Sequence, residues 1–262
     1  MFSLLSRISL ALGFALIVSA ILLTGAPEGR AAQDLPPEQG LTPTMEDEIK
    51  LMIESYISEN PEILLEAIES LRQRDAEKRQ GGVKKAIRAK RDELKNSPYS
   101  PTGGNPKGDV TIVEFSDYRC PFCKRMMPVT KKLIKEDGNI RIVYKEFPIL
   151  GTVSTYAAQA ALAAWYTQPG KYEAFHEAIL AARGDMTEER VLAIADDVGL
   201  DSDAIEKAMI RPEVNKEIQR NLKLAAELNI TGTPTYIIGR ELVPGAVSFE
   251  DLKGFVAEAR KR

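Results

Sequence analysis

The sequence predicts an α/β domain with a helical insertion, preceded by an amino-terminal helical segment and a charged stalk. The stretches "DVTIVEFSDY" (109–118) and "NIRIVYKEF" (139–147) are rich in β-branched residues and flank a helical stretch, the order of a parallel β-α-β unit. Residues 154–228 then show helical patterns, broken by Gly, Pro or Asp near 168–170, 184–186, 199–203 and 211–212. Finally, "NITGTPTYIIGRELVPGA" predicts two short strands joined at Gly239-Arg240, before a helix from Ser248 to Lys261.

The composition argues against nucleic acid as a partner. The chain has 262 residues, with 35 basic and 38 acidic side chains and a formal net charge of -3. This balance gives no global electrostatic attraction to a polyanion. The length is sufficient for a large hydrophobic core, so disulfides are not needed to hold the fold together.

The amino terminus, residues 1–32, has the layout of a secretory signal peptide. Arg7 precedes an apolar run from Ile8 to Leu23, and small residues follow near Ala31 and Ala32. The alternative is an uncleaved membrane anchor, although the run is shorter than the roughly 20 residues that usually span a bilayer. Both interpretations place the rest of the chain outside the cytoplasm, where disulfide chemistry is permitted.

Residues 33–71 form the predicted oligomerisation segment, which holds two short amphipathic helices. Asn60 is a suitable N-cap for the second helix, and Pro61 suits its first turn. Two such helices cannot bury their apolar faces alone, so we expect these faces to meet copies from other chains. The alternative is that they fold back onto the main domain. The apolar positions are Met45, Ile49, Met52, Ile53, Tyr56 and Ile57 in the first helix and Ile63, Leu64, Ala67, Ile68 and Leu71 in the second.

Residues 72–97 are predicted to form a charged helical stalk outside the core. Its only large apolar residues are Val83, Ile87 and Leu94, and Gly81-Gly82 marks a candidate hinge. The basic stretch "KKAIRAKR" has acidic neighbours, which favour a solvated helix face over a nucleic-acid or membrane patch. The Pro- and Gly-rich stretch "NSPYSPTGGNPKGD" then marks the boundary of a catalytic domain that spans residues 98–262.

Both cysteines of the chain lie in "CPFC", at positions 120 and 123. As a structural staple they would close so small a ring that the stabilisation is on the order of 2 kcal/mol before strain. A closed zinc site needs about four ligands, yet His176 is the only histidine. Lys124, and not a histidine, follows the second cysteine, so haem attachment of the c type is excluded. A redox-active pair remains, which needs no other cofactor.

Helix-end electrostatics assign the roles within this pair. If the strand ends near Asp117 and the helix begins near Pro121, Cys120 lies at the helix amino terminus, where free N–H groups and the macrodipole stabilise a thiolate. Cys120 is then the attacking thiol. Cys123, one turn further and less exposed, is placed to resolve the mixed disulfide.

Thr233-Pro234 and Glu114 have candidate roles, each with an ordinary alternative, whereas His176 has none. Thr233-Pro234 precedes a strand, where a cis bond would leave the carbonyl and N–H of Thr233 free for an extended substrate, although base rates alone favour trans. Glu114 lies in an apolar strand and is either a surface residue or a buried proton acceptor for Cys123, paired with Lys145. We interpret His176 as a residue on the polar face of a helix, without a catalytic role.

The motifs "VEFSDYRCPFC", "YKEFPILG" and "GTPTYIIGRELVPGA", in this order around a helical block, resemble the DsbA family of exported thiol-disulfide oxidoreductases. The resemblance covers residues 98–262 and implies a thioredoxin fold with a helical insertion. It implies that Cys120 is the nucleophile, Cys123 the resolving thiol, Pro234 a cis-proline and Glu114 a buried acid. It also implies residence in a Gram-negative periplasm. The segment "SYISENPEILLEAIESL" is similar to the helices with which ScsC-type, copper-tolerance members oligomerise.

The resemblance leaves three functions to compare. Phe122 and Thr233 replace the histidine and valine of the founding oxidases, which together with the amino-terminal helices favours an oligomeric disulfide isomerase or reductase, a trimer by preference. Such an enzyme would act on unfolded or wrongly paired exported proteins and receive electrons from a membrane partner of the DsbD or ScsB type. The alternatives are a monomeric dithiol oxidase with a DsbB-type partner, and a Cu(I)-binding protein that uses the same soft thiols.

Overall fold

The computed structural model of the protein describes residues 42–261. The predicted signal peptide, residues 1–32, lies outside this described part. Within residues 42–261, no helix is long and apolar enough to cross a membrane. The described residues fall into two units, which meet between Leu65 and Glu66 in the sequence.

The amino-terminal segment holds the two predicted helices, α1 (Pro43–Glu59) and α2 (Glu62–Ala89). Thr42 caps α1 through its side chain. Asn60 does not cap the second helix as predicted, but ends the first, because its backbone and side-chain N–H groups both donate to Tyr56 O, at 3.0 and 2.8 Å. The apolar residues of α1 are exposed except for the half-buried Ile57, and none of the residues of α1 is buried.

The predicted stalk contributes to the core, contrary to our expectation. Helix α2 continues without a break through Gly81-Gly82, the candidate hinge, and a short helix α3 (Arg91–Lys95) follows it. Ile87 and Leu94 are buried, and they pack in one apolar cluster with Val113 of the sheet. The carboxyl end of the stalk is therefore part of the domain.

The sheet of the main domain has five strands in the order β1-β3-β2-β4-β5. As predicted, β2 and β3 are parallel, and a crossover helix connects them. Strand β1 lies in the predicted boundary stretch and pairs antiparallel with β3, a pairing that its glycine-rich sequence does not reveal. The bounds are β1 (Thr102–Gly104), β2 (Val110–Ser116), β3 (Ile140–Glu146), β4 (Thr235–Ile238) and β5 (Glu241–Pro244).

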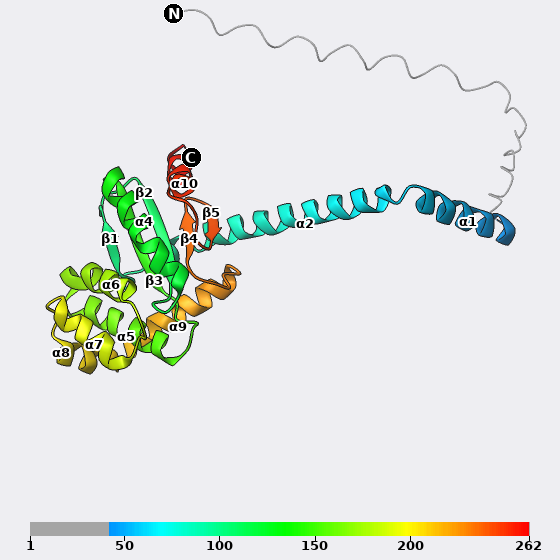
Figure 1. Cartoon of the computed structure of the whole chain (residues 1–262). Helices are drawn as coiled ribbons and strands as arrows, with labels where there is room; N and C mark the ends of the chain where they lie inside the picture. The colour runs from blue at the N-terminus through cyan, green and yellow to red at the C-terminus, as the bar shows by residue number, and fades with distance from the viewer. Residues whose placement is uncertain (1–41, 262) are drawn as a thin grey trace, which may run out of the picture. The chain divides into compact units, whose positions relative to one another are not determined.

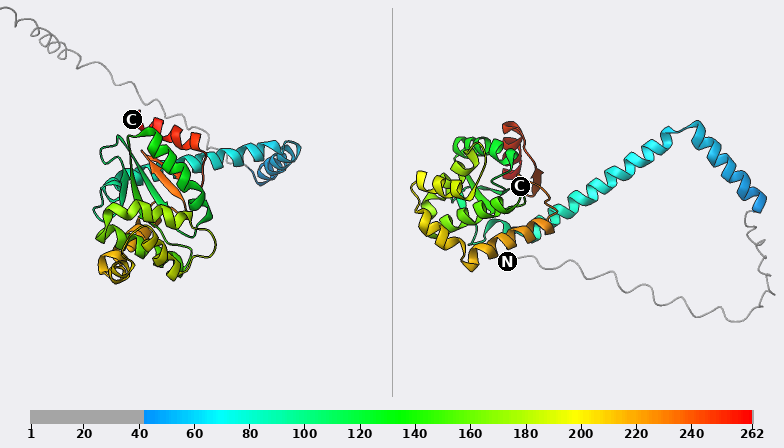
Figure 2. Two further views of the ribbon diagram at one scale, coloured as in Figure 1. Left: turned by 60° about the vertical axis from the view of Figure 1, so that its left-hand side comes forward. Right: turned by 60° about the horizontal axis from the view of Figure 1, so that its bottom comes forward.

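Alternation along the strands divides the core into two layers. Helices α4 (Pro121–Asp137) and α10 (Phe249–Arg260) lie side by side on the first face of the sheet (Figure 1). The other face is covered by α9 (Pro212–Glu227) and by the carboxyl end of α2 (Figure 2). The site described below lies on the first face.

The predicted helical insertion is present, and its breaks fall where Gly, Pro and Asp interrupt the pattern. Helix α5 runs through the middle of this block and contacts the other helices of the insertion. Its many alanines allow this close approach, because their small side chains let the axes of neighbouring helices come near each other. The insertion comprises α5 (Thr152–Thr167), the 3₁₀ turn η1 (Pro169–Lys171), α6 (Tyr172–Ala181), α7 (Glu188–Asp197), α8 (Ser202–Met209) and α9.

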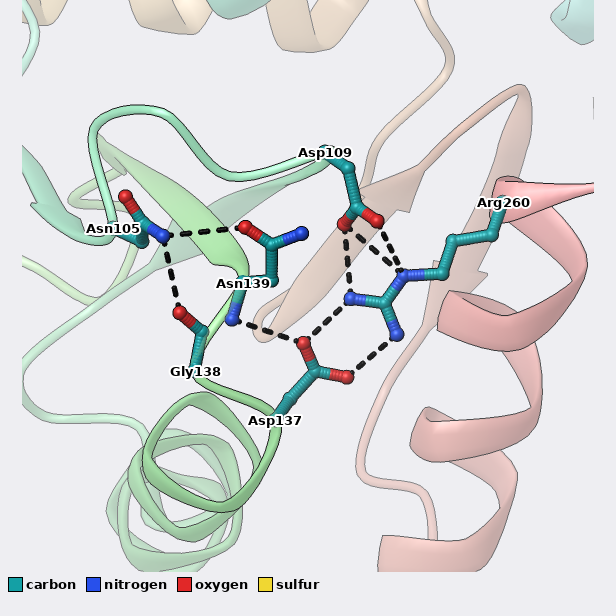
Figure 3. A network of polar contacts seen from close by, with 6 residues as sticks. All are labelled: Asn105, Asp109, Asp137, Gly138, Asn139 and Arg260. Carbon is teal, nitrogen blue, oxygen red and sulfur yellow. Dashed lines mark hydrogen bonds and ion pairs between the residues drawn. The ribbon is translucent and has the colours of Figure 1, made fainter.

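Arg260 fastens the last helix to the domain (Figure 3). Its guanidinium bridges Asp109, at the start of β2, and Asp137, at the end of α4, with the shortest contacts at 2.9 and 2.5 Å. The contacts to Arg260 lower the pKa of both carboxyl groups. This fork joins three elements at one corner of the fold.

Leu94→Ala tests whether the end of the stalk belongs to the core. The variant is expected to lose about 2–5 kcal/mol of unfolding free energy, because a fully buried leucine leaves a cavity. Urea denaturation measures the loss. Ile210→Ala, at a position that is 82% exposed, is the control and should change stability by less than about 0.5 kcal/mol. Equal effects of the two substitutions would contradict the assignment.

Candidate active site

The CPFC motif lies at the junction of β2 and α4, as predicted. Cys120 is the N-cap residue of α4, and Pro121 occupies the first helical position, where the missing N–H costs nothing. The Cys120 N–H donates to Asp117 O at 3.0 Å, which closes the turn after the strand. Cys123 follows one turn into the helix and is fully buried.

Both cysteines are free thiols in this structure, and Cys120 keeps a small exposed fraction of 4%. Burial raises the pKa of the Cys123 thiol well above its usual range, and the negative charges of Glu114 and Cys120 add to this effect. Cys123 is thereby held as a thiol that solvent does not reach. The partly accessible Cys120 is the cysteine that a partner can approach.

The Thr233-Pro234 bond is cis, as the resemblance implies. The pairing of β4 with β2, in which Thr235 lies opposite Phe115, brings this bond to the CPFC turn. Cys120 Sγ donates to Thr233 O at 3.2 Å, so the carbonyl that we expected to be free has a partner in the dithiol state. Thr235 Oγ1 closes the turn by donating to Gly232 O at 2.8 Å.

Glu114 is buried, which agrees with its interpretation as a buried acid and not with that as a surface residue. Its carboxyl group accepts a hydrogen bond of 3.2 Å from the hydroxyl of Tyr236, which also contacts Thr130. Burial raises the pKa of Glu114 to about 7, and the tyrosine hydrogen bond offsets part of this rise. Near neutral pH this carboxyl group can therefore both accept and release a proton.

Lys145 does not pair with Glu114. The expectation is wrong because neighbouring residues of a strand point to opposite faces, and the residue opposite Glu114 is Tyr144. On the other face, the Lys145 ammonium donates to Glu93 O at 2.8 Å and to Ser100 Oγ at 2.7 Å. It also lies 3.9 Å from Glu217, and burial lowers its pKa to about 8.

Asp117 organises the loop before CPFC, a role that the sequence did not suggest. The carboxylate is buried and accepts bonds from the N–H groups of Ile149 and Leu150, at 2.8 and 3.0 Å. It also accepts from Arg119 N and from Ser154 Oγ, both at 2.8 Å. One side chain therefore ties the CPFC turn to the "PILG" loop and to the start of the helical insertion.

His176 is buried, and not on a polar helix face as we interpreted it. Its Nδ1 lies 2.9 Å from the hydroxyl of Tyr118, two residues before Cys120. The same hydroxyl donates to Glu146 Oε1 at 2.9 Å, and Tyr172 donates to that oxygen at 2.8 Å. Burial lowers the pKa of His176 to about 3, so the ring is neutral at physiological pH.

Glu146 is a second buried acid on the face that carries Glu114. Burial raises its pKa to about 8, with smaller contributions from the charges of Asp117 and Glu114, whereas the two tyrosine hydrogen bonds lower it. Its Oε2 has no hydrogen-bond partner among residues 42–261. The first face of the sheet thus holds two carboxyl groups whose pKa values burial raises to about 7 and about 8, so both carry protons at neutral pH for a substantial part of the time.

The surroundings of Cys120 are apolar at the surface. Phe122 is half exposed, and Ile149 and Leu150 of the loop tied by Asp117 are also exposed. The guanidinium of Arg125 lies over the Phe122 ring, 4.9 Å from its centroid. No group of three potential His, Cys, Asp or Glu metal ligands occurs within the described part of the chain.

Two family matches cover separate parts of the chain. Residues 111–257 match the family described as DSBA-like thioredoxin domain. Residues 46–78 match the family described as copper resistance protein ScsC N-terminal domain. The first match contains the CPFC motif and the cis-proline, and the two together confirm the resemblance and the fold that it implies.

Solved structures give the same assignment. A thioredoxin-like oxidoreductase from Silicibacter pomeroyi DSS-3 is 48% identical, with a TM-score of 0.63, and the match covers 66% of this chain and 98% of the relative. ScsC of Proteus mirabilis, in a transitional conformation, is 29% identical with a TM-score of 0.63, and the match covers 84% of this chain and 99% of the relative. The second similarity extends beyond the catalytic domain.

Curated relatives include proteins of different length. Disulfide bond formation protein D of Bacillus subtilis is 24% identical over 171 residues, which cover 62% of this chain and 77% of that protein. The Na(+)/H(+) antiporter NhaA 1 of Salinispora arenicola is 29% identical over 157 residues. This match covers 60% of the chain, which spans only 24% of the antiporter.

Glu114→Gln tests the buried acid. The folded protein holds Glu114 protonated up to a pKa of about 7, whereas the unfolded chain ionises it near 4.5. Between these values the folded state binds more protons, so the wild type should lose about 1.4 kcal/mol of stability per pH unit as the pH rises, relative to Glu114→Gln. Urea denaturation of the reduced proteins from pH 4.5 to 7.5 measures this difference.

Glu136→Gln, at an exposed position of α4, is the control for this pH series and should follow the wild type throughout. A difference between wild type and Glu114→Gln that stays constant over the interval would show that Glu114 is ionised in the folded protein.

Proposed function

Because the chain belongs to the family of thiol-disulfide oxidoreductases with a DSBA-like thioredoxin domain, we propose that it exchanges disulfides with cysteines of other proteins through Cys120 and Cys123. One observation carries this proposal. Cys120, which keeps 4% exposure at a helix amino terminus, lies against the carbonyl that precedes a cis-proline, and the fully buried Cys123 follows one helical turn later. In this arrangement a partner can reach the sulfur of Cys120, and the buried sulfur of Cys123 is placed to resolve the mixed disulfide.

The exchange has two steps. In the dithiol state the Cys120 thiolate attacks a substrate disulfide, the substrate S–S bond breaks, and a mixed disulfide forms as one substrate thiolate leaves. Cys123 then loses its proton and attacks Cys120 Sγ, which releases the second substrate thiolate and leaves the enzyme oxidised. We assign acceptance of the Cys123 proton to Glu114, which is buried nearby and has a pKa of about 7.

We propose disulfide isomerisation or reduction as the direction of this chemistry. In isomerisation, a second thiol of the substrate resolves the mixed disulfide, so that no electrons are gained or lost and Cys120 returns to the thiol. Phe122 offers no hydrogen-bond donor that would stabilise the thiolate beside it, which supports a weaker oxidant than a histidine would give. Thr233 before the proline is the second departure from the founding oxidases.

The amino-terminal helices support an oligomeric enzyme. Most apolar residues of α1 and of the first turns of α2 are exposed, and the match to the ScsC N-terminal domain covers most of α1 and the first part of α2. An apolar stripe that faces solvent is stabilised when copies of the chain cover it. Several active sites held on one assembly act at a high effective concentration on one misfolded substrate. We favour a trimer.

Two other functions are compatible with the same thiols. A monomeric dithiol oxidase would use the identical steps in reverse, with a DsbB-type partner as electron acceptor. A Cu(I)-binding protein would use Cys120 and Cys123 as soft ligands. The half-exposed Phe122 and the apolar loop beside Cys120 favour a protein partner over a metal ion, because an apolar surface around a thiol offers contacts to a polypeptide.

The cellular setting follows from the family. We propose that residues 1–32 direct export to the periplasm, that the oligomerisation segment spans residues 33–71, and that the catalytic domain occupies residues 98–262 with the buried end of the stalk, at Ile87 and Leu94, packed into it. A related structure is described as a periplasmic thioredoxin-like protein from Salmonella enterica serovar Typhimurium. Electrons for a reductase or isomerase would come from a membrane partner of the DsbD or ScsB type.

Cys123→Ala should trap substrates. Without the resolving thiol, Cys120 of the reduced variant attacks a disulfide of scrambled ribonuclease, one substrate thiolate leaves, and the mixed disulfide accumulates until dithiothreitol is added. Non-reducing electrophoresis measures the complex. Cys120→Ala is the matched control and should trap none. Equal trapping by the two variants would show that Cys120 is not the attacking cysteine.

Tyr56→Glu tests the oligomer. The substitution places a charge in the exposed apolar stripe of α1, so the mass in solution should fall to that of a monomer and reshuffling of scrambled ribonuclease should drop. Light scattering and the ribonuclease assay measure the two effects. Ser58→Glu adds the same charge outside the stripe and should leave both unchanged. A monomeric Tyr56→Glu that isomerises as well as wild type would remove oligomerisation from the mechanism.

A further inference from the structure

A second concave site lies on the catalytic domain, away from the cysteines. It is a pocket of about 450 Å³ between the end of α2, helix α3, the β4–β5 turn and helix α10. All four elements belong to the same compact unit. The volume is within the range of roughly 300–1,000 Å³ that is typical of small-molecule sites.

Four cationic side chains line this pocket: Arg88, Arg91, Lys95 and Arg240. None of the four forms a side-chain hydrogen bond or ion pair with any residue between 42 and 261. Neighbouring cations behave differently, since Lys84 binds Glu241 at 2.9 Å. The pocket therefore holds four cationic side chains for which no ion pair is found within residues 42–261.

The pocket lining also contains two carboxylates. Glu241 and Glu258 both belong to the lining. Glu241 is bound by Lys84, and Glu258 Oε2 accepts from the Lys261 ammonium at 3.2 Å. Each acidic group is thus already in contact with a base that is not among the four cations.

Lys95 shows the effect of this crowding. Its side chain is half-buried between α3 and the domain, and burial lowers the pKa of its ammonium group. The positive charges of Arg91 and Arg141 lower it further. Arg141 is held in place because its guanidinium donates to Lys95 O at 2.7 Å. A bound anion would relieve the repulsion among these groups.

The chemistry of the lining selects the class of ligand. Guanidinium groups bind the oxygens of phosphate in a bidentate fashion, and an ammonium group adds a point charge. The apolar residues Ile87, Ile238 and Phe255 also line the pocket, so an apolar portion of the ligand can be covered. We propose that this pocket binds a phosphate-bearing anion, either free or as the headgroup of an anionic phospholipid.

Binding here has a structural consequence. The ligand would hold α2 and α3, which form the end of the stalk, against the β4–β5 turn and α10. A ligand that binds only the folded protein raises its stability in proportion to the logarithm of the ligand concentration. The basic stretch "KKAIRAKR", which contains Arg88, is then part of a phosphate site and not only a solvated helix face.

The experiment uses the full chain and pyrophosphate as probe, with isothermal titration calorimetry as the measurement. The wild type should bind, and Arg88→Gln/Arg91→Gln should bind at least tenfold more weakly, because two of the four cations are gone. Arg211→Gln/Lys216→Gln, which removes two exposed charges of α9, is the matched control and should bind like wild type. Arg240→Gln, on a different element, should also weaken binding.

Sedimentation with vesicles distinguishes the two sources of phosphate. Vesicles of phosphatidylglycerol and phosphatidylcholine are compared with vesicles of phosphatidylcholine alone. Loss of vesicle binding in Arg88→Gln/Arg91→Gln, but not in the control variant, identifies a lipid headgroup, whereas pyrophosphate binding without vesicle binding identifies a free ligand. Failure of the wild type to bind either probe, or equal losses in both double variants, overturns the proposal.

Thiol exchange gives an independent control. The pocket residues lie outside the cysteine site, so Arg88→Gln/Arg91→Gln should reduce an insulin disulfide at the wild-type rate. Matching circular dichroism melts in the absence of ligand exclude unfolding as the cause of weaker binding. Ligand binding at the pocket is therefore tested independently of the function that we propose for the cysteines.

Discussion

The antiparallel pairing of β4 with β2 is the constraint on which the site depends. Thr235 lies opposite Phe115, so the turn that contains Thr233 and Pro234 ends beside the turn that contains Cys120, although more than a hundred residues separate them in the chain. The 3.2 Å contact from Cys120 Sγ to Thr233 O is the direct result. Any shift of this register by one residue would move each side chain to the opposite face of the sheet and separate the two turns.

Burial then determines the protonation of the groups beneath this contact. Glu114 and Glu146 point to the same face, and loss of solvent is the largest cause of the raised pKa of each. Asp117 is also buried, but it accepts four hydrogen bonds and so has the partners that a carboxylate needs. The site therefore combines one structural carboxylate with two proton-binding acids. The negative charges of Asp117 and Glu114 add to the raised pKa of Glu146.

The sequence predicted much of the fold, because the signals for it are local. The β-branched strands, the proline after Cys120 and the breaks in the helical insertion all act within a few residues. It failed where a side chain's environment depends on distant elements. Leu94 lies in a charged stretch and was placed outside the core, yet α9 and the sheet bury it. His176 was placed on a polar helix face, yet the rings of Tyr118 and Tyr144, from outside its helix, pack against it. For the same reason no local pattern indicated a role for Glu146. Its partners are Tyr118, which follows β2, and Tyr172, at the start of α6.

The two thiols differ because Cys120 keeps a small exposed fraction at the start of α4, whereas Cys123 is fully buried. Alkylation of the reduced wild-type protein with iodoacetamide at pH 7, followed by mass spectrometry of the peptides, compares the two sulfurs directly. We expect that Cys120 is modified while Cys123 remains protected until the protein is unfolded in urea. Modification of Cys123 at the same rate as Cys120 in the folded protein would contradict it.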